Sequence, residues 1–203
     1  MADESTDHYF DAVPATPDRR KDITTRIWGR EMTFTTSAGV FSQDGLDKAT
    51  SLLLQHSTPP AEGTVLDLGC GWGPLACAIA AASPGAEVWA VDPNERALDL
   101  TRTNAANLGV TVHAVLPDDV PGDISFDQIW SNPPIRIGKH ALHELLLRWL
   151  PRLSADGSAH LVVAKNLGSD SLQNWLTAQG WPTERSASAK GFRILQVARP
   201  SSS

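Results

Sequence analysis

The stretch Val65-Leu66-Asp67-Leu68-Gly69-Cys70-Gly71-Trp72-Gly73-Pro74 decides the fold. In it an apolar run typical of a buried strand leads into three alternating glycines, and a helical pattern follows over residues 75–82. Glycine allows the backbone to turn sharply and lets a ligand lie against it, because no Cβ is in the way. In doubly wound α/β proteins the turn after the first strand is where nucleotides bind.

Short β-rich segments and helical segments alternate on the carboxyl side of this stretch. The β-rich segments are 65–69, 87–92, 110–116, 126–132, 159–164 and 191–198, and the helical segments are 75–82, 95–108, 140–153 and 171–179. This alternation predicts an α/β fold, a doubly wound and mostly parallel sheet with helices on both faces. The last β-rich segment follows a short helix and a Gly-Trp-Pro turn, so it is compatible with a final antiparallel hairpin.

The segment that precedes the alternating core has a different pattern. Residues 23–36 alternate around Gly29, which predicts two short strands and a turn, and residues 43–56 have the spacing of a helix that ends before Pro59-Pro60. We expect one domain over residues 19–203, with the hairpin and helix in 19–60 and the catalytic core in 61–199. Residues 1–18 are expected to form a mobile acidic tail.

The net charge of the chain is negative, but the distribution of the charges does not exclude a nucleic-acid partner. The 203 residues include 17 Lys and Arg against 23 Asp and Glu, a net charge of -6. The first 18 residues hold five of the acids and no Lys or Arg, so the remainder carries 18 acids against 17 bases. A nearly neutral domain is compatible with a local RNA-binding surface.

Membrane, export and redox signals are missing from the pattern of the sequence. No apolar run approaches the roughly 20 residues that a bilayer-spanning helix needs, and the acidic start is unlike a secretory signal. We therefore expect a cytoplasmic protein. Cys70 and Cys77 are too far apart for a CxxC pair, and no His or Cys cluster predicts a zinc site.

Two acids indicate which ligand the glycine turn binds. A dinucleotide-binding turn has its third glycine at the position that Pro74 occupies here. Asp67 stands two residues before the first glycine and can face a cationic group, and Asp92 ends the next strand, where it can accept hydrogen bonds from two ribose hydroxyls. A ligand with a ribose, an amine and a sulfonium, without phosphate, fits these residues better than a pyrophosphate does.

These motifs together resemble the class I S-adenosylmethionine-dependent methyltransferases of the small-domain family. The resemblance rests on DLGCGWGP at 67–74, AVDPNERAL at 90–98 and SNPPIRIGK at 131–139, and it extends from about Ile23 to Val197. The nearest subgroup is that of the single-domain relatives of the small-subunit rRNA guanine-N2 methyltransferases. The resemblance implies a Rossmann-like sheet of seven strands, and S-adenosylmethionine as methyl donor with S-adenosylhomocysteine as product.

The resemblance also implies which residues bind the cofactor. The first-strand turn would hold its methionine part, the second strand end its ribose, the loop after the third strand its adenine, and a segment before the core would close over it. These residues are Asp67, Gly69, Cys70, Gly71 and Gly73; Asp92 and Asn94; either Asp118 or Asp119; and Phe41 and Ser42. For Phe41, plain core packing is the alternative.

The motif Asn132-Pro133-Pro134-Ile135 is the candidate catalytic motif. It follows a strand and therefore stands at the carboxyl edge of the sheet, beside the glycine turn. The Asn132 side-chain oxygen and the Pro133 carbonyl can accept both N–H groups of a planar exocyclic amine, which aims its lone pair along the S–CH3 axis. Relatives that act on adenine or glutamine usually have an aromatic residue at the fourth position, where this chain has Ile135.

Several interpretations of the substrate side stay open at this point. The resemblance implies methyl transfer to a guanine N2 in 16S (small-subunit) rRNA, as naked RNA or as an assembled subunit. The candidates for RNA phosphate contact are Arg136, Lys139, Lys165, Lys190 and Arg193, although the first two also suit a solvated helix start. The alternatives are a protein glutamine, an adenine N6 or a small molecule as substrate, a catalytically silent module, and a nicotinamide oxidoreductase. We expect no metal, since His140 and His143 have no third ligand beside them, and a monomer by default.

Overall fold

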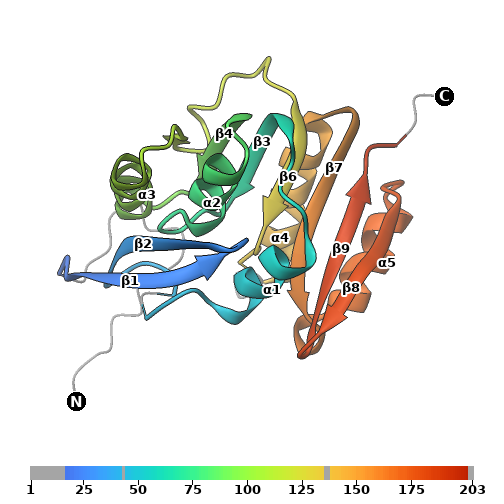
Figure 1. The fold of residues 1–203 in the computed structure, drawn as a ribbon. Helices are drawn as coiled ribbons and strands as arrows, with labels where there is room; N and C mark the ends of the chain where they lie inside the picture. The colour runs from blue at the N-terminus through green and yellow to red at the C-terminus, as the bar shows by residue number, and fades with distance from the viewer. Residues whose placement is uncertain (1–16, 43, 135–137, 201–203) are drawn as a thin grey trace.

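The computed structural model describes residues 17–42, 44–134 and 138–200 (Figure 1). A two-stranded hairpin precedes a seven-stranded sheet of order β5-β4-β3-β6-β7-β9-β8. The strands are β1 (Arg20–Ile27), β2 (Arg30–Ser37), β3 (Glu62–Leu68), β4 (Gly85–Val91), β5 (His113–Val115), β6 (Phe126–Ser131), β7 (Leu153–Ala164), β8 (Thr183–Ala189) and β9 (Phe192–Ala198). The helices are α1 (Lys48–His56), α2 (Pro74–Ala82), α3 (Glu95–Leu108), α4 (Lys139–Trp149) and α5 (Ser169–Ala178), with the 3-10 turns η2 (Leu150–Arg152) and η3 (Lys165–Leu167).

The sheet confirms the predicted fold class. Strands β5, β4, β3, β6 and β7 are parallel to one another, and the hairpin of β9 and β8 is added antiparallel to β7 at one edge. Strand order reverses between β3 and β6, so the connections leave these two strands on opposite sides. A crevice at the carboxyl ends of such strands is where ligands bind in open α/β sheets.

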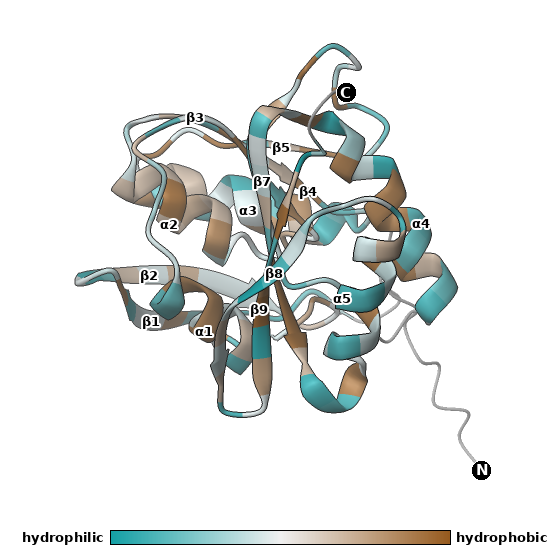
Figure 2. Ribbon diagram, turned by 90° about the vertical axis from the view of Figure 1, so that its right-hand side faces the viewer, coloured by the Kyte–Doolittle hydropathy of each residue, from teal (hydrophilic) through white to brown (hydrophobic). Residues whose placement is uncertain are grey.

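Two hydrophobic clusters cover the two faces of the sheet. One face packs against the hairpin, α1, α2 and α3, through residues such as Phe34, Leu53 and Leu98. The other face packs against α4 and α5, through residues such as Leu146 and Leu176. The edge strand β8 is largely hydrophilic while its neighbour β9 is hydrophobic (Figure 2), and a polar edge of this kind discourages pairing with other chains.

The hairpin turn also fixes one end of helix α1. Trp28 and Gly29 both have positive φ angles, +46° and +79°, as a two-residue hairpin turn of the primed type requires. The indole N–H of Trp28 donates to the carbonyls of Leu54 at 2.9 Å and Ser57 at 3.2 Å, where α1 ends. The strained turn residue thus gives the last carbonyls of the helix a donor that they lack within the helix.

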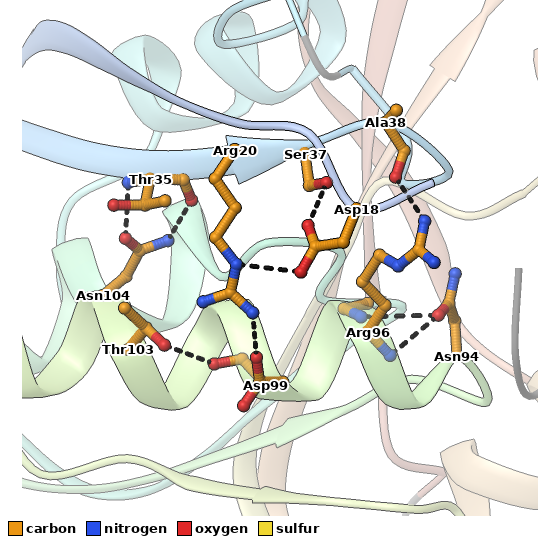
Figure 3. A network of polar contacts seen from close by, with 11 residues as sticks. Asp18, Arg20, Thr35, Ser37, Ala38, Asn94, Arg96, Asp99, Thr103 and Asn104 are labelled. Carbon is orange, nitrogen blue, oxygen red and sulfur yellow. Dashed lines mark hydrogen bonds and ion pairs between the residues drawn. The ribbon is translucent and has the colours of Figure 1, made fainter. Parts of the chain in front are cut away.

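A network of polar contacts joins the hairpin to α3 (Figure 3). Arg20 pairs with Asp99 at 2.5 Å, and the Asn104 amide both accepts from the Thr35 N–H at 2.6 Å and donates to the Thr35 carbonyl at 2.9 Å. Asp18, at the end of the segment expected to be a tail, accepts a hydrogen bond from Ser37 at 2.5 Å. The hairpin is therefore docked on the core, and the chain that leaves β2 is held beside the carboxyl edge of the sheet.

Several element boundaries differ from the expectation. The first helix begins at Lys48 and not at residue 43, because Ser42 and Gly45 have positive φ and Asp47 is the N-cap. The fourth helix ends at Trp149 and tightens into a 3-10 turn at Pro151, whose ring cannot donate a helical hydrogen bond. In the part of the chain that the structure describes, no helix is both long and apolar enough to cross a membrane.

Candidate active site

The glycine turn after β3 gives the site its backbone. Gly69, Gly71 and Gly73 have φ angles of +78°, +56° and +84°, a region that residues with a Cβ rarely adopt. A Cβ on Gly73 would lie 2.8 Å from the side chain of Thr101, so this glycine allows α2 and α3 to pack closely. A Cβ on Gly71 would meet nothing within 4 Å, so the space beside Gly71 is open to a ligand.

Asp67 carries a buried carboxyl at the base of this turn. It lies on β3 between Ala90 of β4 and Trp130 of β6, and it is only 1% exposed. One oxygen, Oδ2, accepts the Ala76 N–H at 3.0 Å, whereas Oδ1 is buried without a partner. Burial raises the pKa of Asp67 to about 7, more than the Ala76 hydrogen bond lowers it. The unpartnered oxygen is an acceptor that a ligand donor would satisfy.

Asp92 follows β4 and contacts the glycine turn directly. Its Oδ2 accepts the Gly71 N–H at 3.0 Å and its Oδ1 accepts the Asn94 N–H at 2.9 Å. Burial raises the pKa of Asp92 to about 6, although these two hydrogen bonds lower it. The carboxylate holds the turn in shape, and each oxygen keeps a lone pair for a further donor.

A cavity joins the glycine turn to residues from distant parts of the chain. Its lining comes from the turn and the start of α2, the end of β6, the start of α1, and the segment before it. The lining residues are Phe41, Ser42, Asp47, Thr50, Asp67, Gly69, Cys70, Gly71, Trp72, Pro74, Leu75 and Asn132. The structure therefore brings together Asp67, Gly71 and Asn132, which the sequence placed in two separate motifs.

Asn132 faces the first turn of α1. Its Nδ2 donates to Asp47 Oδ1 at 3.1 Å and to Thr50 Oγ1 at 3.2 Å. Pro133 is buried and Pro134 half-buried. Ile135 and Arg136 lie outside the described residues, so their expected positions are not addressed by the structure.

The segment of residues 38–42 lies over this edge because α3 holds it there. Arg96 Nη1 donates to the Ala38 carbonyl at 2.8 Å (Figure 3), and Asn94 Nδ2 donates to the Gly39 carbonyl at 3.0 Å. Further along, Trp72 Nε1 donates to the Ser42 carbonyl at 3.3 Å. Phe41 of this segment is 61% exposed at the cavity, so plain core packing does not account for its position.

Two expected cofactor residues have other side-chain contacts in the structure, and a third is exposed. Asn94 is the N-cap of α3 and accepts the N–H groups of Arg96 and Ala97, so it acts on the segment 38–42 and on α3. Asp118 is exposed and its carboxylate binds Arg148 of α4 at 2.7 Å. Asp119 is exposed. Neither of these two acids is among the residues that form the cavity described above.

Four of the expected RNA-contacting residues are described by the structure, and they lie at the same edge of the sheet but differ in how exposed their charges are. Lys139 begins α4, Lys165 follows β7 and Lys190 lies in the β8–β9 turn, and all three are exposed. The backbone N–H of Lys165 donates to the Gly191 carbonyl at 2.8 Å, so Lys165 lies beside the β8–β9 turn that contains Lys190. Arg193 is different, because its guanidinium pairs with Asp170 and is largely buried.

Sequence reasoning missed Asp47 and Thr50 as site residues. The signal was present, because an aspartate directly before a helical pattern is a typical N-cap. The helix was expected to begin at residue 43, however, which placed Asp47 in its interior. The structure groups no three His, Cys, Asp or Glu side chains closely enough to hold a metal ion, within the ranges it describes.

Comparison with known proteins places this site in context. Residues 31–196 match the family described as Methyltransferase small domain. The uncharacterized protein YbxB of Bacillus subtilis (strain 168) is 31% identical over 171 residues, which cover 82% of this chain and 85% of that protein. Ribosomal RNA small subunit methyltransferase C of Citrobacter koseri is 40% identical over 119 residues, which cover 56% of this chain and 34% of that protein, so the match spans about a third of that curated relative.

A solved structure shares the fold over almost the whole chain. It is the T. thermophilus 16S rRNA N2 G1207 methyltransferase (RsmC), in complex with AdoMet and guanosine. The TM-score is 0.78 at 24% identity, and the superposition covers 92% of this chain and 52% of the other.

Proposed function

The chain belongs to the methyltransferase small domain family and is an S-adenosylmethionine-dependent methyltransferase, and from this premise we propose that it methylates the exocyclic N2 amine of a guanine in small-subunit rRNA. One observation carries the proposal: Asn132 and Asp67 line a single cavity. A side chain that can accept an amine N–H therefore stands beside the carboxyl and the glycine turn that suit the methyl donor. The relatives named for small-subunit rRNA methylation support the choice of substrate.

The residues of the cavity, together with Asp92, which binds the Gly71 N–H, fit S-adenosylmethionine. This cofactor supplies a methyl group on a cationic sulfur, and it carries an ammonium group, a ribose and an adenine. The unpartnered Oδ1 of Asp67 would accept the ammonium N–H groups, and the open space at Gly71 would admit the chain that follows. Asp92 would use its remaining lone pairs for the ribose hydroxyls, while Phe41 and Ser42 would cover the bound molecule.

Asn132 and Pro133 would orient the guanine amine. The Asn132 Oδ1 atom and the Pro133 carbonyl would accept its two N–H groups, which favours the pyramidal nitrogen of the transition state and aims its lone pair at the methyl carbon. Two consecutive prolines hold that carbonyl rigidly, because their φ angles are fixed. The methylated amine is cationic until it releases a proton, so the chain needs no strong base.

The exposed lysines at the carboxyl edge would bind the RNA backbone. Lys165 follows the end of β7 and lies next to Lys190, which is in the turn between β8 and β9. Lys139 begins the helix that follows the catalytic motif. Arg136, proposed from the sequence alone, would also contact RNA phosphates. Arg193 is less accessible to RNA, because its side chain is largely buried and pairs with Asp170. A few phosphate contacts give a modest affinity that weakens with salt.

Methyl transfer to isolated small ribosomal subunits tests the proposal. The protein is incubated with S-adenosylmethionine labelled in the methyl group and with subunits from a strain that lacks the protein. We expect label in the RNA from the wild type and none from Asn132→Ala, with equal cofactor affinity for both by calorimetry. Label in the protein fraction would move the substrate to a ribosomal protein, and equal transfer by Asn132→Ala would remove the assigned role of Asn132.

A further inference from the structure

The strongest unexplained feature of the site is the bond between Asn132 and the start of α1. Asp47 is 85 residues away in sequence, yet its Oδ1 lies 3.1 Å from Asn132 Nδ2. Thr50, in the first turn of the same helix, places its Oγ1 3.2 Å from the same nitrogen and is only 4% exposed. The two N–H donors of the Asn132 amide therefore have two acceptors, both on α1.

These contacts decide which way round the amide lies. The carboxylate of Asp47 can only accept hydrogen bonds, so it attracts the NH2 group of Asn132 and repels its oxygen. The amide is planar, with its oxygen and nitrogen on opposite sides of the same carbon. When Nδ2 is held against Asp47, Oδ1 must point away from α1, and neither described hydrogen bond of this side chain uses Oδ1.

We propose that Asp47, with Thr50, is a positioning residue that fixes the Asn132 amide so that its oxygen, and not its NH2 group, faces the substrate amine. The inference rests on the proposed function, in which Oδ1 accepts an amine N–H. The opposite orientation would set an NH2 group against the NH2 group of the substrate, where neither can accept. An asparagine at this position therefore needs a neighbour that excludes the wrong orientation.

Asp47 also caps helix α1, and this structural role must be separated from the positioning of Asn132. Its Oδ1 also accepts the N–H groups of Ala49 at 2.8 Å and Thr50 at 3.2 Å, as the N-cap of α1. Serine caps a helix about as well as aspartate does, but its oxygen stands one bond closer to the backbone and falls short of Asn132. Asparagine keeps both the reach and an acceptor oxygen. The set Asp47→Ser, Asp47→Asn and Asp47→Ala thus distinguishes capping from positioning.

The first readout is single-turnover methyl transfer to small subunits. Asp47→Ser and Asp47→Ala should both lose about 10- to 100-fold in rate, as expected when a reacting group is misplaced. Asp47→Asn should keep most of the wild-type rate. In thermal unfolding, Asp47→Ser should keep the wild-type melting temperature, whereas Asp47→Ala should lower it. Wild-type turnover by Asp47→Ser would overturn the proposal.

The second readout does not depend on the substrate. In 15N-labelled protein the side-chain NH2 resonances of Asn132 are identified by their disappearance in Asn132→Asp. We expect slow hydrogen exchange of these protons in the wild type and in Asp47→Asn, and fast exchange in Asp47→Ser while the α1 backbone amides stay protected. If the wild type methylates no RNA but the exchange pattern follows Asp47, the proposed substrate is wrong and the positioning stands. Unchanged exchange in Asp47→Ser refutes the positioning whatever the substrate is.

Discussion

Replacement of Asp67 by asparagine should change how the stability of the protein depends on pH. Burial raises the pKa of Asp67 from an ordinary 3.8 to about 7. Between these values the folded chain holds a proton that the unfolded chain has released, so the wild type loses stability as the pH rises through this window. A shift of about three units at 1.36 kcal/mol per unit corresponds to about 4 kcal/mol lost by pH 8.

The variant escapes this loss but carries a constant penalty. The side-chain carbonyl that Asp67→Asn introduces can keep the hydrogen bond from Ala76, whereas the new NH2 group takes the place of the unpartnered Oδ1 and costs about 1–3 kcal/mol. We therefore expect Asp67→Asn to be less stable than the wild type at pH 4, where little of this loss has developed, and more stable by about 1–3 kcal/mol at pH 8. Asp92 is present in both proteins, and its raised pKa makes the free energy of unfolding of each fall in the same way as the pH rises.

Urea unfolding followed by tryptophan fluorescence at pH 4, 5, 6, 7 and 8 measures this difference. The free energies of unfolding of the two proteins should cross within this range, and the slope of the variant should be the shallower. The same variant should bind S-adenosylmethionine much more weakly in calorimetry, because it offers the ammonium group a donor in place of an acceptor. A difference in stability that stays constant from pH 5 to pH 8 would refute the assignment of a buried, proton-binding carboxyl to Asp67.

Three further outcomes are expected. Gly73→Ala should destabilise the protein by about 2–5 kcal/mol in urea unfolding, because its Cβ would meet Thr101 at 2.8 Å and its φ is +84°; a loss below 1 kcal/mol would contradict the packing described. The double variant Lys165→Ala/Lys190→Ala should weaken RNA binding and lower the salt slope by about one unit per lysine, and an unchanged slope would place the RNA elsewhere. Phe41→Ala should leave the melting temperature unchanged, since the side chain is 61% exposed, and weaken S-adenosylmethionine binding in calorimetry; unaltered affinity would exclude Phe41 from the cofactor site.

The strands and helices of the core could be predicted because the hydrophobic pattern within each segment indicates which of its residues are buried. The continuous apolar runs before Asp67 and Asp92 indicate strands buried on both faces, and the helical pattern over 95–108 predicts α3 at its observed bounds. The glycine turn and Asp67 follow from the same local pattern. Such signals are short-range, since each depends on residues within a few positions of one another.

The parts that could not be predicted depend on contacts between distant segments. The positive φ angles at Ser42 and Gly45 delay the start of α1 and leave Asp47 free to reach both the helix and Asn132. The pairing of Asp118 with Arg148 likewise joins a loop to a helix 30 residues away. Periodicity carries no information on these pairs, because it depends only on residues that are close together in the sequence.

The identity of the methylated nucleoside tests the central claim most directly. Small-subunit rRNA labelled by the protein and S-adenosylmethionine is digested to nucleosides and analysed by mass spectrometry. We expect N2-methylguanosine, present with the wild type and lost with Asn132→Ala. Label in N6-methyladenosine, or in no nucleoside while the cofactor is bound, would contradict it.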